Sequence, residues 1–471
     1  MKGRMEKDSL GEKEVPADVY YGIQTERAVE NFNISGLKPQ DEFIWATAVI
    51  KCAAARANIK TGMLKQKIGK AIEQAAIEII SGKYRDQFVV DVFQAGAGTS
   101  HNMNANEVIA NIAIEKLGGK RGNYQIVHPN DHVNMSQSTN DTIPTIIRIA
   151  SIRLAAELSE QLSLLITELK RKQREFDDVV KSGRTHLEDA APVRLGQEFG
   201  AYADIMEFDK ARIAHAIEQL GQLNIGATAV GTGVNADPIY VKSVVQELRK
   251  LTGFRLTNSK HLMALTQSMS DFVDMSSAIR TLSADLTKIA NDLRLMNSGP
   301  VTGIGEITLP AVQPGSSIMP GKVNPVIAEC LNMICFQVMG NDLAILMAAQ
   351  AGQLELNVMM PLIAFALLFS LKILNNGVKM FREKLVVGVV ANRERCRELV
   401  ERSPGIALAL NPYIGYSAAA DVVKESLKTG KTIREIVAER GLLKREEIEE
   451  ILDMYQLTEP GIKGKKAKAR R

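Results

Sequence analysis

The chain has 471 residues, a net charge of +4 and a hydrophobic content of 45%. A chain of this length is expected to form two to four domains, or one large domain with appendages. Aromatic residues make up only 5% of it, so the core must be largely aliphatic, which favours packed helices over a β-sandwich. The last nine residues, 463–471, hold six positive charges, so the rest of the chain is close to neutral. This balance excludes a body built to bind nucleic acid and indicates a solvated basic tail.

The cysteines and the apolar segments indicate a cytoplasmic protein without a membrane partner. No apolar run at the N-terminus resembles a signal peptide. The most apolar segment, Val358–Leu371, contains Pro361 and is too short to span a bilayer, so we expect a buried helix there. The cysteines have no spacing typical of a metal site and suit a reducing compartment: Cys52, Cys330, Cys335 and Cys396.

Strand-like runs are few and short, and Gln87–Phe93 is one of them. The first long helix is predicted from Pro144 to Val179, a stretch without glycine or internal proline. Pro144 suits the first turn, where its missing N–H costs nothing. Apolar residues recur in this stretch at helical spacing: Ile147, Leu154, Leu158, Leu162, Leu165, Leu169 and Phe176.

A second long helix is predicted around 275–296, and others over 196–222, 325–351 and 359–386. In the segment 275–296, apolar residues alternate in steps of four and three, which is the seam of a left-handed helix bundle. Seams of this length often pack against other subunits. The seam residues are Met275, Ile279, Leu282, Leu286, Ile289, Leu293 and Met296.

The predicted fold is essentially all-α and has three parts. Residues 1–140 form an N-terminal helical domain with loops that could carry a site, and residues 141–395 form a central bundle of long helices. Residues 396–471 form a small helical domain, with charged helices near 431–440 and 444–454, that ends in the basic tail.

Four loops interrupt the predicted helices and are rich in Gly, Ser, Thr, Asn and His: Gln94–Asn106, His128–Asp141, Ser182–Gly196 and Ser298–Pro325. Long loops in an otherwise regular chain are commonly functional. The longest, 298–325, has the glycines and prolines of a mobile lid and carries Ser316, Ser317, Lys322 and Asn324. A nearby lysine or the backbone N–H groups of a tight turn could stabilise a serine alkoxide there. A surface connector with solvated side chains is the alternative.

The other loops offer neutral hydrogen-bond donors. Gly96–Asn104 contains Thr99 just before a helix and could present donors to an anion, although Thr99 or Ser100 could equally be an ordinary helix cap. His128–Asn134 and Gln137–Asp141 repeat this pattern. In Gly183–Asp189, His186 could exchange a proton near neutral pH or could simply be solvated. Together, these donors and one lysine suit a small dicarboxylate, and no metal cluster or phosphate loop stands out.

These motifs resemble the aspartase/fumarase superfamily across nearly the whole chain. The most specific is Gly315–Pro325, which reads GSSIMPGKVNP and is similar to the characteristic loop of that family. Six weaker matches stand in the family's order: Glu12–Asp18, the GAGTS stretch, HPNDHVN, QSTND, GRTHLEDA and Gly226–Gly233.

The resemblance implies a three-domain, mainly helical subunit in a homotetramer with a twenty-helix core, in which loops of three subunits build each active site. It implies anti elimination without an organic cofactor, and it leaves activation by a divalent cation open. Ser316 would take the Cβ proton, and a doubly charged aci-carboxylate would form. Thr99, Ser138, Thr139 and Ser317 would hold that group. Lys322 and Asn324 would hold the α-carboxylate, with Thr185 nearby, and Asn140 and His186 would lie by the departing amino group.

Within the family, the sequence favours the aspartase branch, with L-aspartate and fumarate as the expected small-molecule ligands. Gly96–Ser100, Gln137–Asp141 and Gly352–Asn357 are similar to aspartases, whereas Gly315–Pro325 would serve a class II fumarase equally well. Fumarase is therefore the alternative. A non-enzymatic structural protein and a nucleic-acid-binding protein acting through its tail are remote ones, because the serine and lysine of the loop are both retained.

Overall fold

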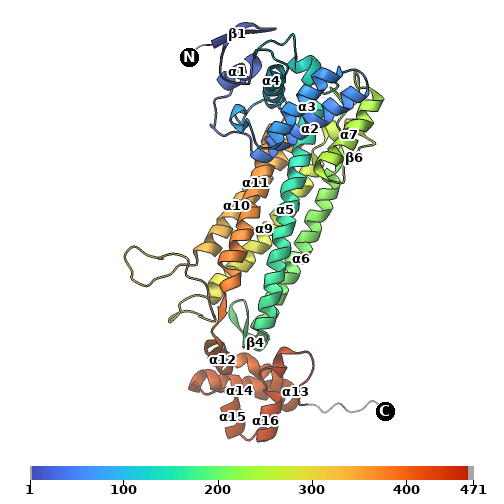
Figure 1. Cartoon of the computed structure of the whole chain (residues 1–471). Helices are drawn as coiled ribbons and strands as arrows, with labels where there is room; N and C mark the ends of the chain where they lie inside the picture. Colours follow the sequence, from blue (N-terminus) through green and yellow to red (C-terminus); the bar gives the residue numbers. More distant parts are fainter. Residues whose placement is uncertain (1–2, 465–471) are drawn as a thin grey trace, which may run out of the picture. The chain divides into compact units, whose positions relative to one another are not determined.

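A computed structural model describes residues 3–464, so the basic tail from 465 onward lies outside the described residues (Figure 1). The chain groups into two compact units. Unit 1 comprises the chain up to Glu160, Asp209–Ala284 and Ile334–Asn376. Unit 2 comprises Gln161–Phe208, Asp285–Met333 and the chain from Gly377 onward. The division into three domains remains a prediction.

Unit 1 begins with an antiparallel hairpin that the sequence did not predict, formed by β1 (Gly3–Asp8) and β2 (Gly11–Pro16). The helices and helical turns that follow are α1 (Ile23–Asn31), α2 (Asp41–Lys60), α3 (Gln66–Ile80), η1 (Arg85–Gln87), α4 (Thr99–Lys116) and the π-helical turn η2 (Pro129–Val133). Later in the chain come β5 (Gln222–Leu223), α7 (Pro238–Thr252), β6 (Thr257–Asn258) and α8 (Leu262–Gln267). β5 and β6 pair in parallel.

The strand predicted at Gln87–Phe93 is wrong. Its backbone makes hydrogen bonds with a side chain instead of a neighbouring strand: Asn104 Nδ2 donates to Gln87 O at 2.9 Å, and Val89 N donates to Asn104 Oδ1 at 3.1 Å. A side chain that satisfies an extended backbone in this way removes the need for a ladder.

Five long helices each contribute residues to both units: α5 (Thr139–Glu175), α6 (Leu195–Leu220), α9 (Ser270–Met296), α10 (Val326–Gln350) and α11 (Met360–Lys384). The fold is mainly α-helical, as predicted. Every residue of the predicted seam in α9 is buried, and none is more than 6% exposed. The apolar residues predicted along 147–176 are buried as well.

The start of α5 differs from the prediction. The helix begins at Thr139, so Pro144 lies inside it and not at its first position. A proline within a helix leaves the carbonyl four residues earlier without its usual partner. Here that carbonyl is Asn140 O, and Asn224 Nδ2 donates to it at 3.4 Å. The proline is tolerated because a distant amide replaces the missing N–H.

The apolar segment Val358–Leu371 was expected to be too short to span a membrane, but its residues 360–371 belong to α11, which continues to Lys384 and is long enough. Pro361 lies in the first turn of the helix and does not interrupt it. By length and composition, α10 and the stretch 360–388 could both cross a bilayer. In the second of these, 61% of the apolar window is buried, which is typical of a core helix.

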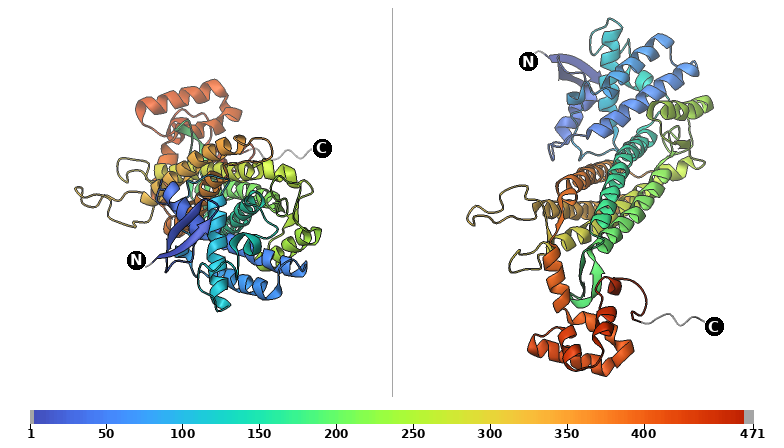
Figure 2. Two further views of the ribbon diagram at one scale, coloured as in Figure 1. Left: turned by 90° about the horizontal axis from the view of Figure 1, so that it is seen from above. Right: turned by 60° about the horizontal axis from the view of Figure 1, so that its bottom comes forward.

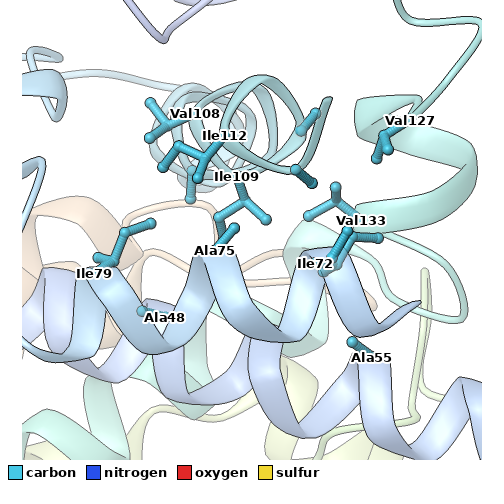
Figure 3. Close-up of a cluster of buried hydrophobic side chains, with 14 of the residues drawn as sticks. Ala48, Ala55, Ile72, Ala75, Ile79, Val108, Ile109, Ile112, Val127 and Val133 are labelled. Atoms are coloured by element: carbon cyan, nitrogen blue, oxygen red, sulfur yellow. The ribbon is translucent and has the colours of Figure 1, made fainter. Parts of the chain in front are cut away.

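The core of unit 1 lies where α3 packs against α2 and α4 (Figure 3). Figure 3 shows Ile72, Ala75 and Ile79 of α3 directed toward Val108, Ile109 and Ile112 of α4. Small residues of α2, among them Ala48 and Ala55, let α3 approach closely. This packing holds the middle and the end of α4, the helix that begins at Thr99.

Unit 2 contains a hairpin where a loop was predicted over Ser182–Gly196: β3 (Val180–Thr185) pairs with β4 (Glu188–Arg194). The long loop between α9 and α10 is irregular, as predicted, apart from β7 (Ile307–Thr308), which pairs with β8 (Val390–Ala391) (Figure 2). The remaining elements are η3 (Val386–Gly388), α12 (Arg393–Arg402), η4 (Pro404–Leu410), α13 (Asn411–Ile414), α14 (Tyr416–Thr429), α15 (Ile433–Glu439), α16 (Arg445–Ile451) and η5 (Gln456–Thr458).

Candidate active site

Two helix N-termini meet in unit 1 at a pair of threonine hydroxyls. α4 begins at Thr99 and α5 at Thr139, and the two Oγ1 atoms are 3.3 Å apart. The turn before α4 is unusual because φ is positive at three successive residues: Gly96 (86°), Ala97 (57°) and Gly98 (94°). Glycine adopts such angles without strain, so GAGTS forms a tight approach to the helix. Converging helix N-termini attract a carboxylate.

A buried lysine lies behind this pair. Lys51, on α2, is fully buried, and its Nζ donates to Asn102 Oδ1 at 2.8 Å and to Asn134 Oδ1 and Gln137 Oε1 at 3.0 Å each. Burial lowers the pKa of Lys51 to about 7, and the charge of Asp141 opposes this shift. Burial raises the pKa of the Asp141 carboxyl to about 6. Lys51, Asn102, Asn134 and Gln137 thus form a polar network beneath the threonines.

The loop 226–233 fixes Asn140 at the start of α5. Asn140 Nδ2 donates to Ala229 O at 2.7 Å, which leaves Asn140 Oδ1 free to accept a hydrogen bond from a ligand. The neighbouring Asp141 anchors the same loop, because its carboxylate accepts from the backbone N–H groups of Ser138, Gly226 and Thr228 at 2.9 to 3.0 Å. Ser138 Oγ accepts from Asn140 N at 3.2 Å.

In unit 2, Thr185 and His186 stand at the tip of the β3–β4 hairpin, and both are exposed. The two central turn residues, His186 (φ 57°) and Leu187 (φ 66°), have positive φ, as in a type I′ turn. Such a turn normally uses glycine or asparagine, so this backbone is strained. Strain of this kind is often found where a side chain must be held in place.

A buried carboxylate ties the hairpin to the base of the long loop. Glu306 is fully buried and is 2.8 Å from both Lys181 Nζ and Arg184 Nη1 of β3. Its backbone carbonyl accepts from Asn392 N at 2.9 Å. The hairpin and the start of the loop therefore form one anchored structure.

The two ends of the loop Gly315–Pro325 are hydrogen-bonded to each other, and its tip is exposed. Gly315 N donates to Lys322 O at 2.9 Å, and Asn324 Nδ2 donates to Gly315 O at 2.6 Å. A Cβ on Gly315 would lie 2.3 Å from Lys322 O, so only glycine fits. Within the tip, Ser316 Oγ accepts backbone N–H groups from Ile318 at 3.2 Å and Met319 at 2.9 Å. Two aligned N–H groups stabilise negative charge on a serine oxygen.

The predicted site residues thus form separate groups. Thr99, Ser138, Thr139 and Asn140 lie together in unit 1. Unit 2 holds Thr185 and His186 on the hairpin and Ser316, Ser317, Lys322 and Asn324 on the loop. Within residues 3–464, no three His, Cys, Asp or Glu side chains gather in a way that could hold a metal ion.

The sequence prediction missed Lys51. Its signal was a single lysine in the almost entirely apolar run Ala46–Ala55 of a helix. A charged residue in such a position is buried and needs partners. The motifs at 96–104 and 128–141 supply those partners, although the sequence indicated them as donors to an anionic ligand.

Comparison with known families identifies two matches. A family described as lyase matches residues 11–340, and one described as fumarase C C-terminus matches residues 406–459. The chain belongs to the aspartase/fumarase family of lyases.

Individual members of this family are similar over almost the full chain. The aspartate ammonia-lyase of Bacillus subtilis (strain 168) is 52% identical, covering 98% of this chain and 97% of its own. That of Escherichia coli (strain K12) is 45% identical and covers 98% of each. Among solved structures, a cobalt-bound fumarate lyase/delta crystallin from Brucella melitensis has a TM-score of 0.95 and 47% identity, covering 98% of this chain and 100% of its own. A class II fumarase from Schistosoma mansoni has a TM-score of 0.94 and 36% identity, covering 97% and 99%.

Proposed function

We propose that this chain is an aspartate ammonia-lyase, which converts L-aspartate reversibly to fumarate and ammonia. The observation that carries the proposal is the environment of Ser316, whose oxygen accepts two backbone N–H groups. The loop that carries it is closed by the hydrogen bond from Gly315 N to Lys322 O and by the Asn324 amide. Full-length relatives at 44–52% identity bear the name aspartate ammonia-lyase, which supports this reaction over other eliminations.

In the proposed reaction, the Ser316 alkoxide takes the Cβ proton, and the electrons of the C–H bond move into the β-carboxylate as an aci-carboxylate. That group then carries two negative charges, and the hydroxyls of Thr99, Ser138, Thr139 and Ser317 bind it more strongly than they bind the substrate. When the Cα–N bond breaks, those electrons form the double bond of fumarate. Ammonia leaves with the bonding pair of Cα–N.

The remaining groups bind the other end of the substrate. Lys322 and Asn324 hold the α-carboxylate, with Thr185 nearby. Asn140 offers its free Oδ1 to the amino group, since its Nδ2 is already bound to Ala229 O. His186 lies by the departing ammonia and can exchange a proton with it.

We infer that the active enzyme is a cytoplasmic homotetramer whose sites combine loops from three subunits. The face of α10 supports association. Met333, Phe336, Leu343 and Met347 are between 56% and 63% exposed and recur at heptad spacing around Gly340. Cys52, Cys330 and Cys396 are free thiols, which suits a reducing compartment.

The assignment is tested by giving the purified protein L-aspartate and L-malate in separate assays and following fumarate by its ultraviolet absorbance. Turnover of aspartate is expected. Turnover of malate alone would assign the chain to the fumarases, with which it shares the loop Gly315–Pro325. Absence of turnover with either substrate would leave a non-enzymatic role.

Replacing Ser316 by alanine should lower kcat by at least about a thousandfold, because the proton of Cβ then has no base. Circular dichroism and subunit mass should stay unchanged, since the side chain is partly exposed. Near-normal turnover by Ser316→Ala would show that another group is the base.

A further inference from the structure

The Lys51 ammonium sets the direction of every amide that it contacts. An ammonium has three N–H donors and no acceptor, so each neighbouring amide must turn its oxygen toward it. Asn102, Asn134 and Gln137 each do so, at 2.8 to 3.0 Å. The fully buried position excludes bulk water as a competing partner.

The nitrogen ends of these amides then have fixed partners. Asn102 Nδ2 is directed at Asn134 Oδ1, 3.1 Å away, and at Thr139 Oγ1, 3.4 Å away. Asn134 Nδ2 donates to Gln137 O, and Gln137 Nε2 donates to Val133 O. Turning any of the three amides over would place an N–H against the ammonium and lose an acceptor for it.

The orientation of the Asn102 amide determines how the hydroxyl of Thr139, which faces the substrate in the proposed reaction, is hydrogen-bonded. A hydroxyl has one proton to give and can also accept. Because Asn102 Nδ2 and Thr99 Oγ1 both donate to Thr139 Oγ1, the proton of Thr139 is available to a ligand. With the amide of Asn102 reversed, Thr139 would instead have to donate to the amide oxygen.

We propose that Lys51 is a positioning residue for the reaction, which orients the Asn102 amide so that Thr139 donates its proton to the β-carboxylate. This inference rests on the proposed function. If Lys51 acts in this way, its replacement changes the rate of the reaction through the hydroxyl of Thr139. The replacement of a purely structural lysine would affect only folding.

The first test is Lys51→Met, which keeps the length of the side chain and removes its donors. The expected result is a fall in kcat for aspartate of about tenfold or more, with KM changed by less than about threefold, since the lost hydrogen bond strengthens only as the carboxylate gains charge. The same substitution in a Thr139→Val background should lower kcat by less than about twofold further, because the two residues act through one hydroxyl. Equal effects in both backgrounds would overturn the proposal.

A second variant serves if Lys51→Met does not fold. Asn102→Asp keeps an acceptor for the ammonium but replaces the donor that faces Thr139 with an oxygen. It should also lower kcat at least about tenfold, and this loss should disappear in the Thr139→Val background. Normal kcat in Asn102→Asp would contradict the proposed orientation.

Lys172→Met is the matched control, because Lys172 is also buried, at 3% exposed, and its Nζ donates to Val389 O in unit 2. The folded control should keep its kcat, and its effect should add to that of Thr139→Val. A loss like that of Lys51→Met would overturn the proposal. Wild-type protein that does not convert aspartate would refute the proposed function, whereas an active wild type with an active Lys51→Met refutes only the role of Lys51.

Discussion

His101 is a histidine of α4 that the proposed reaction does not use, and its burial makes it a source of acid instability. Its ring is 7% exposed, lies 5.2 Å from the ring of Phe43, and has Gln94 Nε2 at 3.3 Å. Burial lowers the pKa of His101 to about 4. In the unfolded chain a histidine has a pKa near 6.5, so between these values the unfolded state binds more protons than the folded one.

The free energy of unfolding should therefore fall as the pH is lowered from about 6.5 to about 4, with a contribution from His101 of about 3 kcal/mol. Replacing His101 by glutamine should remove this contribution, because the amide does not titrate. Urea unfolding of both proteins from pH 7 to pH 4 measures the difference. Parallel curves for the two proteins would mean that His101 has the same pKa in the folded and the unfolded state.

At the scale of single elements, the β3–β4 hairpin combines a rigid base with a strained tip. Glu306 holds the base through Lys181 and Arg184, while His186 and Leu187 carry positive φ at the tip. Leu187 is 70% exposed, so its side chain contributes little packing. The ion pairs at the base thus hold the hairpin in a turn with positive φ at two residues that disfavour it.

Replacing Leu187 by glycine should raise the free energy of unfolding by about 1 kcal/mol, because glycine adopts positive φ without strain. Leu187→Ala is the control: it removes the same exposed side chain but keeps the Cβ, and should give no gain. Thermal unfolding of the wild type, Leu187→Gly and Leu187→Ala measures these differences in stability. If alanine stabilises as much as glycine, the exposed side chain and not the backbone was unfavourable.

The same elements show what could be predicted from the sequence. The seams of α5 and α9 were predictable because apolar spacing alone places those residues in a core, and all of them are buried. The β3–β4 hairpin was not, since His186-Leu187 lacks the residues that mark a type I′ turn. The start of α5 was missed because Asn224, far along the chain, compensates for Pro144. The donors assigned to the site from their motifs remain predictions, whereas Lys51 could be found only from the packing around it.

At the scale of the whole molecule, the exposed apolar face of α10 bears on whether the enzyme is a monomer or an oligomer. The residues Met333, Phe336, Leu343 and Met347 follow heptad steps, with Gly340 between them, where a Cβ would meet no atom within 4 Å. An apolar heptad face without a cover is costly in water, and the same pattern on a second copy can cover it. This face resembles the buried seam of α9 in its spacing, but not in its exposure.

Replacing Phe336 and Leu343 together by glutamate should dissociate the proposed tetramer, because two charges on each of the packed helices could not be desolvated. Turnover of aspartate should fall with the subunit mass, since the proposed sites need loops from three subunits. Leu427→Glu on α14 is the control, as Leu427 is 71% exposed and does not belong to the heptad pattern of α10, and it should leave both properties unchanged. Sedimentation velocity and the fumarate assay, run on the same samples, relate the state of association to the turnover of aspartate. A dissociated double variant with full activity would place all the catalytic groups of one site within a single chain.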